Sequence, residues 1–311
     1  MFLPPTTDPQ PLAMIIENAI SPYAEMLAYE TLWALQGVSL KTIAEWVKQN
    51  PVVPSKLLRA KEGEVLFSEV AAIREQVAAF LATIKEPFSI CVHGTFEYPA
   101  RLRDAKYPLE LFYYKGDIGL LESKCISIVG ARECTPEGAK RAAKLAKGLV
   151  KQGFTVVSGL AKGIDTAAMA TAMEVGGNTI GVIGTPIDQH YPKENQQLQQ
   201  QVAKRHLLVS QVPFYRYSKE PFSSKKYYFP QRNETMAAIS EATVIVEASD
   251  TSGSLTQARA CVQQGRKLFI LNSCFERKDI TWPAKYEKEG AIRVRDIDDL
   301  LNVVGDAKVK A

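Results

Sequence analysis

The pattern of apolar and polar positions changes character near residue 87. Before that point, apolar residues recur at helical spacing in "YAEMLAYETLWALQG", in "SLKTIAEWVKQN" and over residues 67–84. Gly37 and Ser39 separate the first two segments, and Pro51 and Pro54 end the second. The pattern predicts a small helical domain over residues 1–86 and a second domain over residues 87–311.

The first two predicted helices are connected by the segment "QGVSL", and this connection allows two interpretations. It is either a helix-hairpin-helix that offers backbone N–H groups to phosphates, or a purely structural pair of helices. The connection lacks a second glycine and a nearby arginine, which favours the structural pair.

After Pro87, short β-rich runs alternate with helical stretches. Continuous apolar strands separated by helices are typical of a parallel sheet covered on both faces. With right-handed crossovers, the pattern predicts an α/β fold with a Rossmann-like, doubly wound, mostly parallel sheet. The expected strands are "ISIVG", "FTVVSG", "NTIGVIG", "HLLVSQ", "ATVIVEA", "KLFIL" and "AIRVRD". The expected helices cover residues 137–151, 164–175, 193–204 and 254–264, with one more opened by Asn233.

Three turns that follow these strands place a cation just before a predicted helix: Arg132, Lys162 and Arg232. A cation is disfavoured beside the positive end of a helix dipole, whereas an anion binds well there. Nearby glycines let the backbone approach a phosphate closely. Because ligands of such sheets bind at the carboxyl ends of the strands, the pattern predicts a polyanion site. Its expected residues are Gly130, Arg132, Ser158, Gly159, Lys162, Gly163, Arg232 and Asn233.

The long turn between Phe214 and Arg232 holds seven aromatic and five basic residues against the single acid Glu220. Exposed rings interleaved with cations suit unpaired bases, which stack on aromatic faces. The alternative is that several of these rings pack the loop onto the domain. The candidates for base stacking are Phe214, Tyr215, Tyr217 and Tyr228.

Charge distribution agrees with an anionic partner without proving one. The net charge is only +4, but residues 124–163 hold eight Lys or Arg against two acids. Part of this cluster has a simpler explanation, because a lysine stripe at helical spacing is usually a solvated helix face. That stripe consists of Lys140, Lys144, Lys147 and Lys151.

Several classes of protein are disfavoured by composition. The five cysteines are scattered without a CxxC pair, as expected of reduced thiols in a cytoplasm. With only three histidines, no protein-bound metal is expected. The chain has no run of eighteen apolar residues and its start is unlike a secretory signal, so no membrane span is expected and a cytoplasmic location is predicted.

Enzymatic motifs are also missing. No GxGxxG follows a strand and no GxxxxGK[ST] occurs, so neither a dinucleotide cofactor nor P-loop hydrolysis is expected. "SGLAKGID" lacks the GxSxG turn of a nucleophile. Asp165 and Asp188 are interpreted as caps or dipole partners, not as catalytic acids. A nucleotide-cleaving phosphoribohydrolase remains the enzymatic alternative, but "SGSLTQARA" lacks the paired glycines and the Glu of that turn. No cofactor and no catalytic residue are therefore assigned.

Five separated motifs occur in the order known from one family: "SIVGAR", "VVSGLAKGIDTAAM", "GVIG…YPKEN", "FPQRN" and "SGSLTQA…GRKLFIL". Together with "YPARLRDAKYPLELFYYKGD", they resemble the DprA/Smf DNA-processing proteins over residues 88–275. The resemblance implies a Rossmann-like domain that binds single-stranded DNA without cleaving it. It also implies a homodimer that loads a RecA-like recombinase. The family's phosphate-binding positions fall on the anion-site residues named above.

This chain departs from the family pattern at several positions. Met169 replaces a histidine and is expected to pack, and Glu234 and Thr235 follow "FPQRN" in place of Arg and an aliphatic residue. "SQVP" and "LNS" replace other family segments, and the chain is expected to end before the winged-helix domain that some members carry. A divergent relative also suits a second hypothesis, a regulatory partner or antitoxin for a cognate toxin in a phage-defence module.

Overall fold

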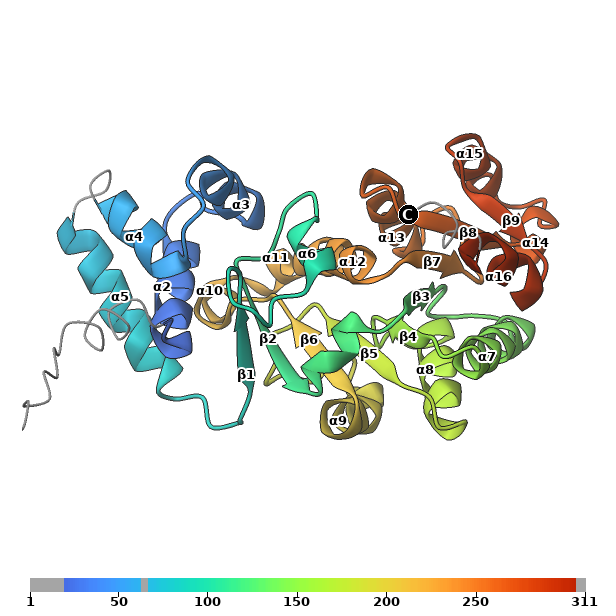
Figure 1. The fold of residues 1–311 in the computed structure, drawn as a ribbon, viewed down its shortest axis with the longest axis horizontal. Helices are drawn as coiled ribbons and strands as arrows, with labels where there is room; N and C mark the ends of the chain where they lie inside the picture. Colours follow the sequence, from blue (N-terminus) through green and yellow to red (C-terminus); the bar gives the residue numbers. More distant parts are fainter. Residues whose placement is uncertain (1–19, 63–66, 306–311) are drawn as a thin grey trace, which may run out of the picture.

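The computed structural model describes residues 20–62 and 67–305, so residues 1–19 and 63–66 of the predicted helical domain lie outside its description (Figure 1). The helices expected in the N-terminal region are present. One more helix begins at Pro54, where a proline is suitable because the first turn of a helix makes no use of the backbone N–H that proline lacks. These helices are α2 (Pro22–Ala34), α3 (Leu40–Gln49), α4 (Pro54–Glu62) and α5 (Phe67–Leu81).

A single mixed sheet of nine strands lies at the centre of the described residues. All seven strands expected from the sequence are present in it, and they run parallel to one another. Two further strands, β1 and β2, were not expected, and they extend the sheet antiparallel beyond β6. The strands are β1 (Ser89–Val92), β2 (Leu111–Gly116), β3 (Cys125–Val129), β4 (Thr155–Ser158), β5 (Thr179–Ile183), β6 (Leu207–Ser210), β7 (Ala242–Ile245), β8 (Lys267–Leu271) and β9 (Ile292–Val294).

The strand order is β1-β2-β6-β5-β4-β3-β7-β8-β9. From β3 the chain winds outward through β4, β5 and β6, then returns to β7 beside β3 and winds the other way. Helices consequently cover both faces: Figure 1 shows α7 (Pro136–Lys151), α8 (Ile164–Glu174) and α9 (Gln196–Arg205) on one side of the sheet, and α12 (Tyr228–Ile239) and α13 (Ser254–Gln263) on the other. The predicted doubly wound, mostly parallel fold is confirmed.

Short elements complete the described chain. They are α6 (Ala100–Arg103), α10 (Phe214–Lys219), α11 (Phe222–Lys225), α14 (Asn272–Phe275), α15 (Trp282–Lys288), α16 (Ile297–Gly305) and the 3₁₀ turns η1 (Ile118–Glu122) and η2 (Lys193–Asn195). The segment after β6 was expected to be a loop, but it is largely helical. The prediction that Asn233 caps a helix is wrong, because α12 already begins at Tyr228. Arg232 therefore lies inside this helix and not before it.

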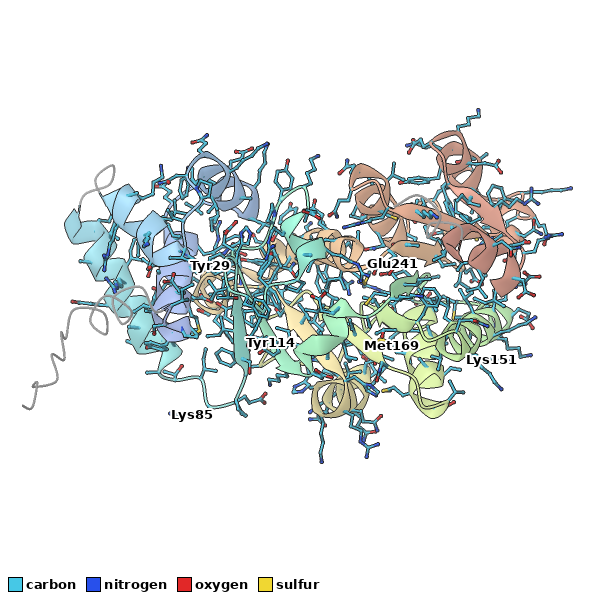
Figure 2. The ribbon with its side chains drawn as sticks, in the orientation of Figure 1. Tyr29, Lys85, Tyr114, Lys151, Met169 and Glu241 are labelled. Carbon is cyan, nitrogen blue, oxygen red and sulfur yellow. The ribbon has the colours of Figure 1, made fainter. Side chains whose placement is uncertain are left out.

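Apolar packing is continuous from the N-terminal helices into the sheet. One cluster joins Leu32 of α2 with Phe112 of β2 and Phe214 of α10, all of them buried. A second cluster lies between the other face of the sheet and α7, α8 and α16. Met169 of α8, which is labelled in Figure 2, is fully buried, and this confirms that it packs. The segments on either side of the predicted boundary near residue 86 thus contribute to one core.

Candidate functional site

The site lies where the topology of the sheet reverses. β3 and β7 are neighbours, and the chain leaves them in opposite directions, which leaves a crevice at their carboxyl ends. A cavity of 1110 Å³ is found there. Its walls come from the turn after β3, the first turns of α12, and the segment from the end of β7 to the start of α13. The position predicted from the sequence for a ligand is therefore hollow.

Arg232 forms part of the cavity wall although its side chain is only 7% exposed. Its Nη1 donates to the carbonyl oxygens of Gly159 (2.7 Å), the residue after β4, and Val182 (2.9 Å), near the end of β5. Its buried Nε has no hydrogen-bond partner in the described structure. The guanidinium thus ties two strand ends together and retains unused donor capacity beside the cavity.

The electrostatic environment of Arg232 is unfavourable for its charge. Burial lowers its pKa, Asp165 partly offsets this effect, and the positive charge of Arg132 lowers the pKa further. Arg232 forms no ion pair with any residue that the structure describes. A buried cation without a paired anion is costly, so an anionic ligand in the cavity would stabilise it.

Arg132 lies in the turn after β3 and is exposed at the cavity wall. Within the described residues it has neither an ion pair nor a hydrogen bond from its side chain. Its charge acts on Arg232, so these two of the three predicted cations lie together at the cavity. Their mutual repulsion is tolerable where a polyanion can lie against both.

Two predicted glycines allow the turns around the cavity to approach each other. Gly163 has φ +76°, and a Cβ placed there would lie 2.4 Å from the carbonyl oxygen of Ala131. A Cβ on Gly130 would lie 2.5 Å from Cγ1 of Ile164. The backbone geometry thus requires glycine at both positions, which brings the turn after β3 against the start of α8.

Ser158 and Gly159 have no free donor for a ligand. The Ser158 hydroxyl is buried and donates to the carbonyl oxygen of Ile128 (2.7 Å), and the Gly159 N–H donates to Asp165 Oδ2 (3.0 Å). A Cβ on Gly159 would lie 1.7 Å from Arg232 Nη1, so this glycine makes room for the guanidinium. Both residues therefore contribute to the shape of the site and not to contacts with a ligand.

Lys162 stands apart from the two arginines. Its Nζ forms an ion pair with Glu194 Oε1 at 2.6 Å, and both side chains are more than half exposed. Lys162 is not among the residues that line the cavity, and a local carboxylate pairs with it, so its predicted contact with phosphate stays a prediction. Asn233 does lie at the cavity wall, where its Nδ2 donates weakly to the carbonyl oxygen of Gly253 (3.4 Å).

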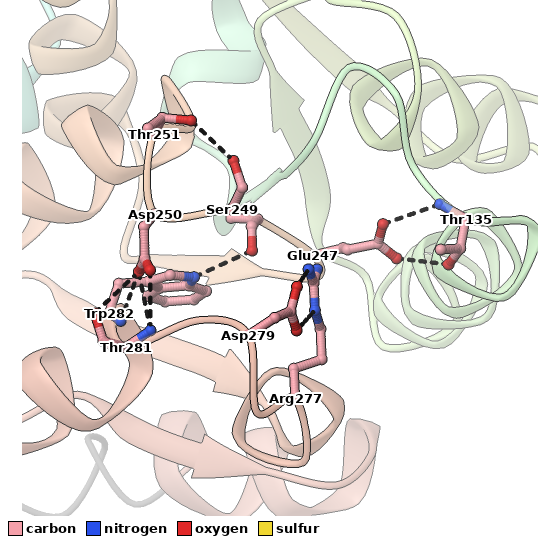
Figure 3. A network of polar contacts seen from close by, with 10 residues as sticks. Thr135, Glu247, Ser249, Asp250, Thr251, Arg277, Asp279, Thr281 and Trp282 are labelled. Atoms are coloured by element: carbon pink, nitrogen blue, oxygen red, sulfur yellow. Dashed lines mark hydrogen bonds and ion pairs between the residues drawn. The ribbon is translucent and has the colours of Figure 1, made fainter.

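The part of the cavity near β7 and β8 carries charges of both signs, from Glu247, Glu276, Arg141 and Arg277. Glu247 accepts hydrogen bonds from the Thr135 N–H (2.9 Å) and hydroxyl (2.7 Å), so its carboxylate already occupies the start of α7 (Figure 3). Figure 3 also shows Arg277 paired with Asp279, and Asp250 receiving the N–H groups of Thr281 and Trp282. The carboxylates of Glu247 and Asp250 are thus already held by donors of the protein itself.

The four rings named as candidates for base stacking are buried, as in the alternative that they pack the segment onto the domain. Phe214, Tyr215, Tyr217 and Tyr228 are 2–9% exposed and pack on protein. Phe214, Tyr215 and Tyr217 lie on the short helix α10, and Tyr228 is the first residue of α12. Their role in base stacking stays a prediction, and in this arrangement their faces are covered by protein.

A different ring, Phe229, lines the cavity and was not singled out from the sequence. It is half-buried, lies against Gly184, and its centroid is 5.5 Å from that of Tyr191, which is 44% exposed. The guanidinium carbon of Arg232 lies 6.0 Å from the centre of the Phe229 ring. The one signal for Phe229 in the sequence is its position in the first turn of α12, close to Arg232. Using this signal requires the correct start of α12, which the sequence analysis did not give.

Other features of the sequence play no part in the cavity. Lys140, Lys144, Lys147 and Lys151 are exposed along α7, opposite its buried face, and Figure 2 shows Lys151 at the periphery.

Among the described residues, no group of three or more His, Cys, Asp or Glu side chains is arranged to hold a metal ion. Within the same residues, no helix has the length and apolar character needed to cross a membrane.

Comparison with known proteins places the chain in one family. The family model for DNA recombination-mediator protein A matches residues 89–305. The chain is 32% identical to DNA processing protein DprA of Bacillus subtilis over 286 residues, covering 88% of this chain and 94% of that protein. It is 38% identical to DprA of Streptococcus pneumoniae over 174 residues, covering 56% of this chain and 59% of the streptococcal protein.

Solved structures give the same result. DNA processing protein A from Streptococcus pneumoniae superimposes with a TM-score of 0.72 at 28% identity, covering 91% of this chain and 98% of that one. A structure described as giving insights into the single-stranded DNA binding mode of DNA processing protein A from Helicobacter pylori has a TM-score of 0.60 at 27% identity. It covers 71% of this chain and 96% of that one.

Proposed function

Since the chain belongs to the DNA recombination-mediator protein A (DprA/Smf) family, we propose that it binds single-stranded DNA in the cavity between β3 and β7. Phosphates lie against Arg132 and Arg232, and a base lies against Phe229. The bound strand is held and not cleaved. The reported single-stranded DNA binding of the Helicobacter pylori relative supports this choice of ligand.

The observation that carries the proposal is the buried, unpaired charge of Arg232. Its Nη1 is engaged by two carbonyl groups, while its Nε is buried and unpartnered at the cavity wall. Hydrogen bonds from a guanidinium to a phosphate are charge-assisted and satisfy such donors. The 1110 Å³ cavity is far larger than one phosphate group, which supports a nucleotide chain as the ligand.

A charge-reversal experiment tests the proposal. Arg132→Glu is expected to weaken binding of a labelled oligothymidylate, followed by fluorescence anisotropy, by about 10- to 100-fold, because a charge-assisted contact is replaced by repulsion. Arg132 is exposed and unpartnered within the described structure, so the variant is expected to fold. Lys151→Glu is the matched control, since it changes the net charge equally outside the cavity. Equal losses for the two variants would show that only overall charge matters.

Salt dependence gives a second measurement. Each phosphate neutralised on a single strand contributes a slope of about −0.7 in log affinity against log salt. The slope of Arg132→Ala is therefore expected to be smaller than that of the natural chain by about one such unit. An unchanged slope would place the phosphates elsewhere.

The finer part of the proposal concerns the pathway. Loading of a RecA-like recombinase by a homodimer, in the cytoplasm, is supported by the family relationship alone. Light scattering of the purified chain measures its oligomeric state. A recombinase filament assay, in which single-stranded DNA is first coated by a competing binding protein, measures loading. A monomer that does not stimulate filament assembly would contradict this part and leave DNA binding intact.

A further inference from the structure

A buried carboxylate joins the N-terminal helices to the segment after β6. Glu30 of α2 is fully buried, and its two oxygens accept the N–H groups of Phe214 (2.8 Å) and Tyr215 (2.9 Å), the first residues of α10. Oε1 also accepts the hydroxyl of Tyr113 on β2. One side chain therefore connects three elements that are far apart in the sequence.

Other contacts between the same elements surround this carboxylate. Arg216 Nη1 donates to the carbonyl oxygens of Trp33 (3.0 Å) and Val38, and its guanidinium carbon lies 5.6 Å from the centre of the Trp33 ring. The Tyr215 hydroxyl donates to Gln76 Oε1 of α5 at 2.8 Å. The N-terminal helices thus fix three successive residues of α10.

From α10 the contacts continue to the cavity. The ring centroids of Tyr217 and Tyr228 lie 5.4 Å apart, and together with Val212 they form a small buried cluster. Tyr228 is the first residue of α12, and the next residue, Phe229, already lines the cavity. Arg232 follows one turn later. The orientation of the start of α12 consequently depends on where α10 is held.

We propose that Glu30 is a positioning residue for the DNA cavity: by holding the first residues of α10, it sets the start of α12 and thereby Phe229 and Arg232. The part of this inference that concerns DNA affinity rests on the proposed function. The part that concerns α12 does not. In this arrangement the N-terminal helices influence the cavity without lining it.

The alternative is that Glu30 only adds stability, as buried, satisfied carboxylates do elsewhere. The chain offers a matched control for this alternative. Glu25 lies on the same helix, is 4% exposed, and accepts the N–H (2.8 Å) and hydroxyl (2.7 Å) of Ser55 at the start of α4. Its contacts stay within the N-terminal helices. Both carboxylates are buried acceptors, and only Glu30 reaches the segment that leads to the cavity.

The experiment compares Glu30→Gln with Glu25→Gln in the full chain. Hydrogen exchange of the amides in α12 is measured without DNA, and affinity for oligothymidylate is measured by anisotropy. Glu30→Gln is expected to accelerate exchange in α12 and to weaken binding by about fivefold, within the range of couplings between residues that do not touch the ligand. Glu25→Gln is expected to change neither quantity by more than about 1.5-fold.

Similar changes in both variants would overturn the proposal, because a general loss of stability would then explain them. Tyr113→Phe is a milder second variant, which removes one donor to Glu30 and keeps the ring in place. It is expected to give a smaller change in the same direction, and no change in α12 exchange would count against the proposal. If α12 exchange responds while the natural chain does not bind oligothymidylate, the positioning role stands and the proposed function fails.

Discussion

Two buried charges in this protein differ in how their hydrogen-bonding capacity is used. Glu30 is surrounded by three donors from the protein itself, and each of its oxygens has a partner. Arg232 donates through Nη1 to two carbonyl groups, but its Nε is buried without a partner in the described structure. The carboxylate is saturated, whereas the guanidinium is not.

Under the proposed function, the difference separates a group that serves the fold from a group that a ligand would satisfy. A buried group whose donors and acceptors are all satisfied locks its neighbours into one arrangement. A buried donor left unpaired beside a cavity costs free energy that a ligand recovers. Variants of Glu30 are therefore expected to act first on stability, and variants of Arg232 first on binding.

The largest expected effect comes from Glu30→Ala. Three buried donors lose their acceptor, and each unsatisfied donor costs roughly 1–3 kcal/mol, partly offset by removing a buried carboxylate. The free energy of unfolding, measured by urea denaturation, is expected to fall by about 3 kcal/mol. Glu25→Ala is the control, with a smaller expected loss because its donors come from one partly buried serine. A loss of less than about 1 kcal/mol for Glu30→Ala would contradict the interpretation that Glu30 serves the fold.

Arg232→Met comes next and tests the other charge. Methionine keeps much of the apolar stem, but the phosphate loses its guanidinium, so oligothymidylate affinity is expected to fall about 100-fold. The variant also leaves the carbonyl groups of Gly159 and Val182 without this donor. Circular dichroism is therefore recorded first to establish that the variant folds. Oligothymidylate should raise the melting temperature of the natural chain and not that of the variant. Equal stabilisation of both would show that Arg232 is structural.

A third prediction uses the pH dependence of stability. Burial outweighs the three hydrogen bonds and raises the pKa of Glu30 to about 7. A raised pKa means that the folded state holds the proton more firmly than the unfolded state. The stabilising contribution is therefore fully present below the unfolded pKa and is lost as the pH rises through the folded pKa. As the pH rises from 5 to 8, ionisation of Glu30 should lower the free energy of unfolding by about 2 kcal/mol.

Glu30→Gln isolates that contribution, because glutamine does not titrate. The difference in unfolding free energy between the natural chain and Glu30→Gln, measured by urea denaturation at several pH values, should shrink or reverse as the pH rises. Parallel profiles for the two proteins would show that Glu30 does not titrate in this range.

The smallest effect is expected for Lys162→Ala. Because Lys162 is exposed and already paired with Glu194, its loss should change stability by less than about 1 kcal/mol and DNA affinity by about twofold. Anisotropy at constant salt measures the second quantity. A loss comparable to that of Arg132→Glu would mean that DNA displaces Glu194, and that Lys162 belongs with the two arginines.

Local pattern determined much of the fold. The seven parallel strands are short continuous apolar runs, and such runs can be buried on both faces only between two layers of helices. Their alternation with helices places the turns at one edge of the sheet, so the location of the cavity followed from the sequence as well. The sequence predicts Gly130 and Gly163 as phosphate contacts, which stays a prediction; the structure shows that both glycines allow a close approach between two turns.

Only the tertiary structure decided which polar groups are free. Lys162 and Arg132 are equivalent in sequence, yet one finds Glu194 across a turn and the other finds no partner in the described residues. The aromatic segment was ambiguous for the same reason, since burial of Phe214 and Tyr215 depends on α2, which lies about 180 residues earlier. Apolar periodicity is a local property of the chain. Whether a charge is satisfied or a ring is covered depends on partners that only folding brings into contact.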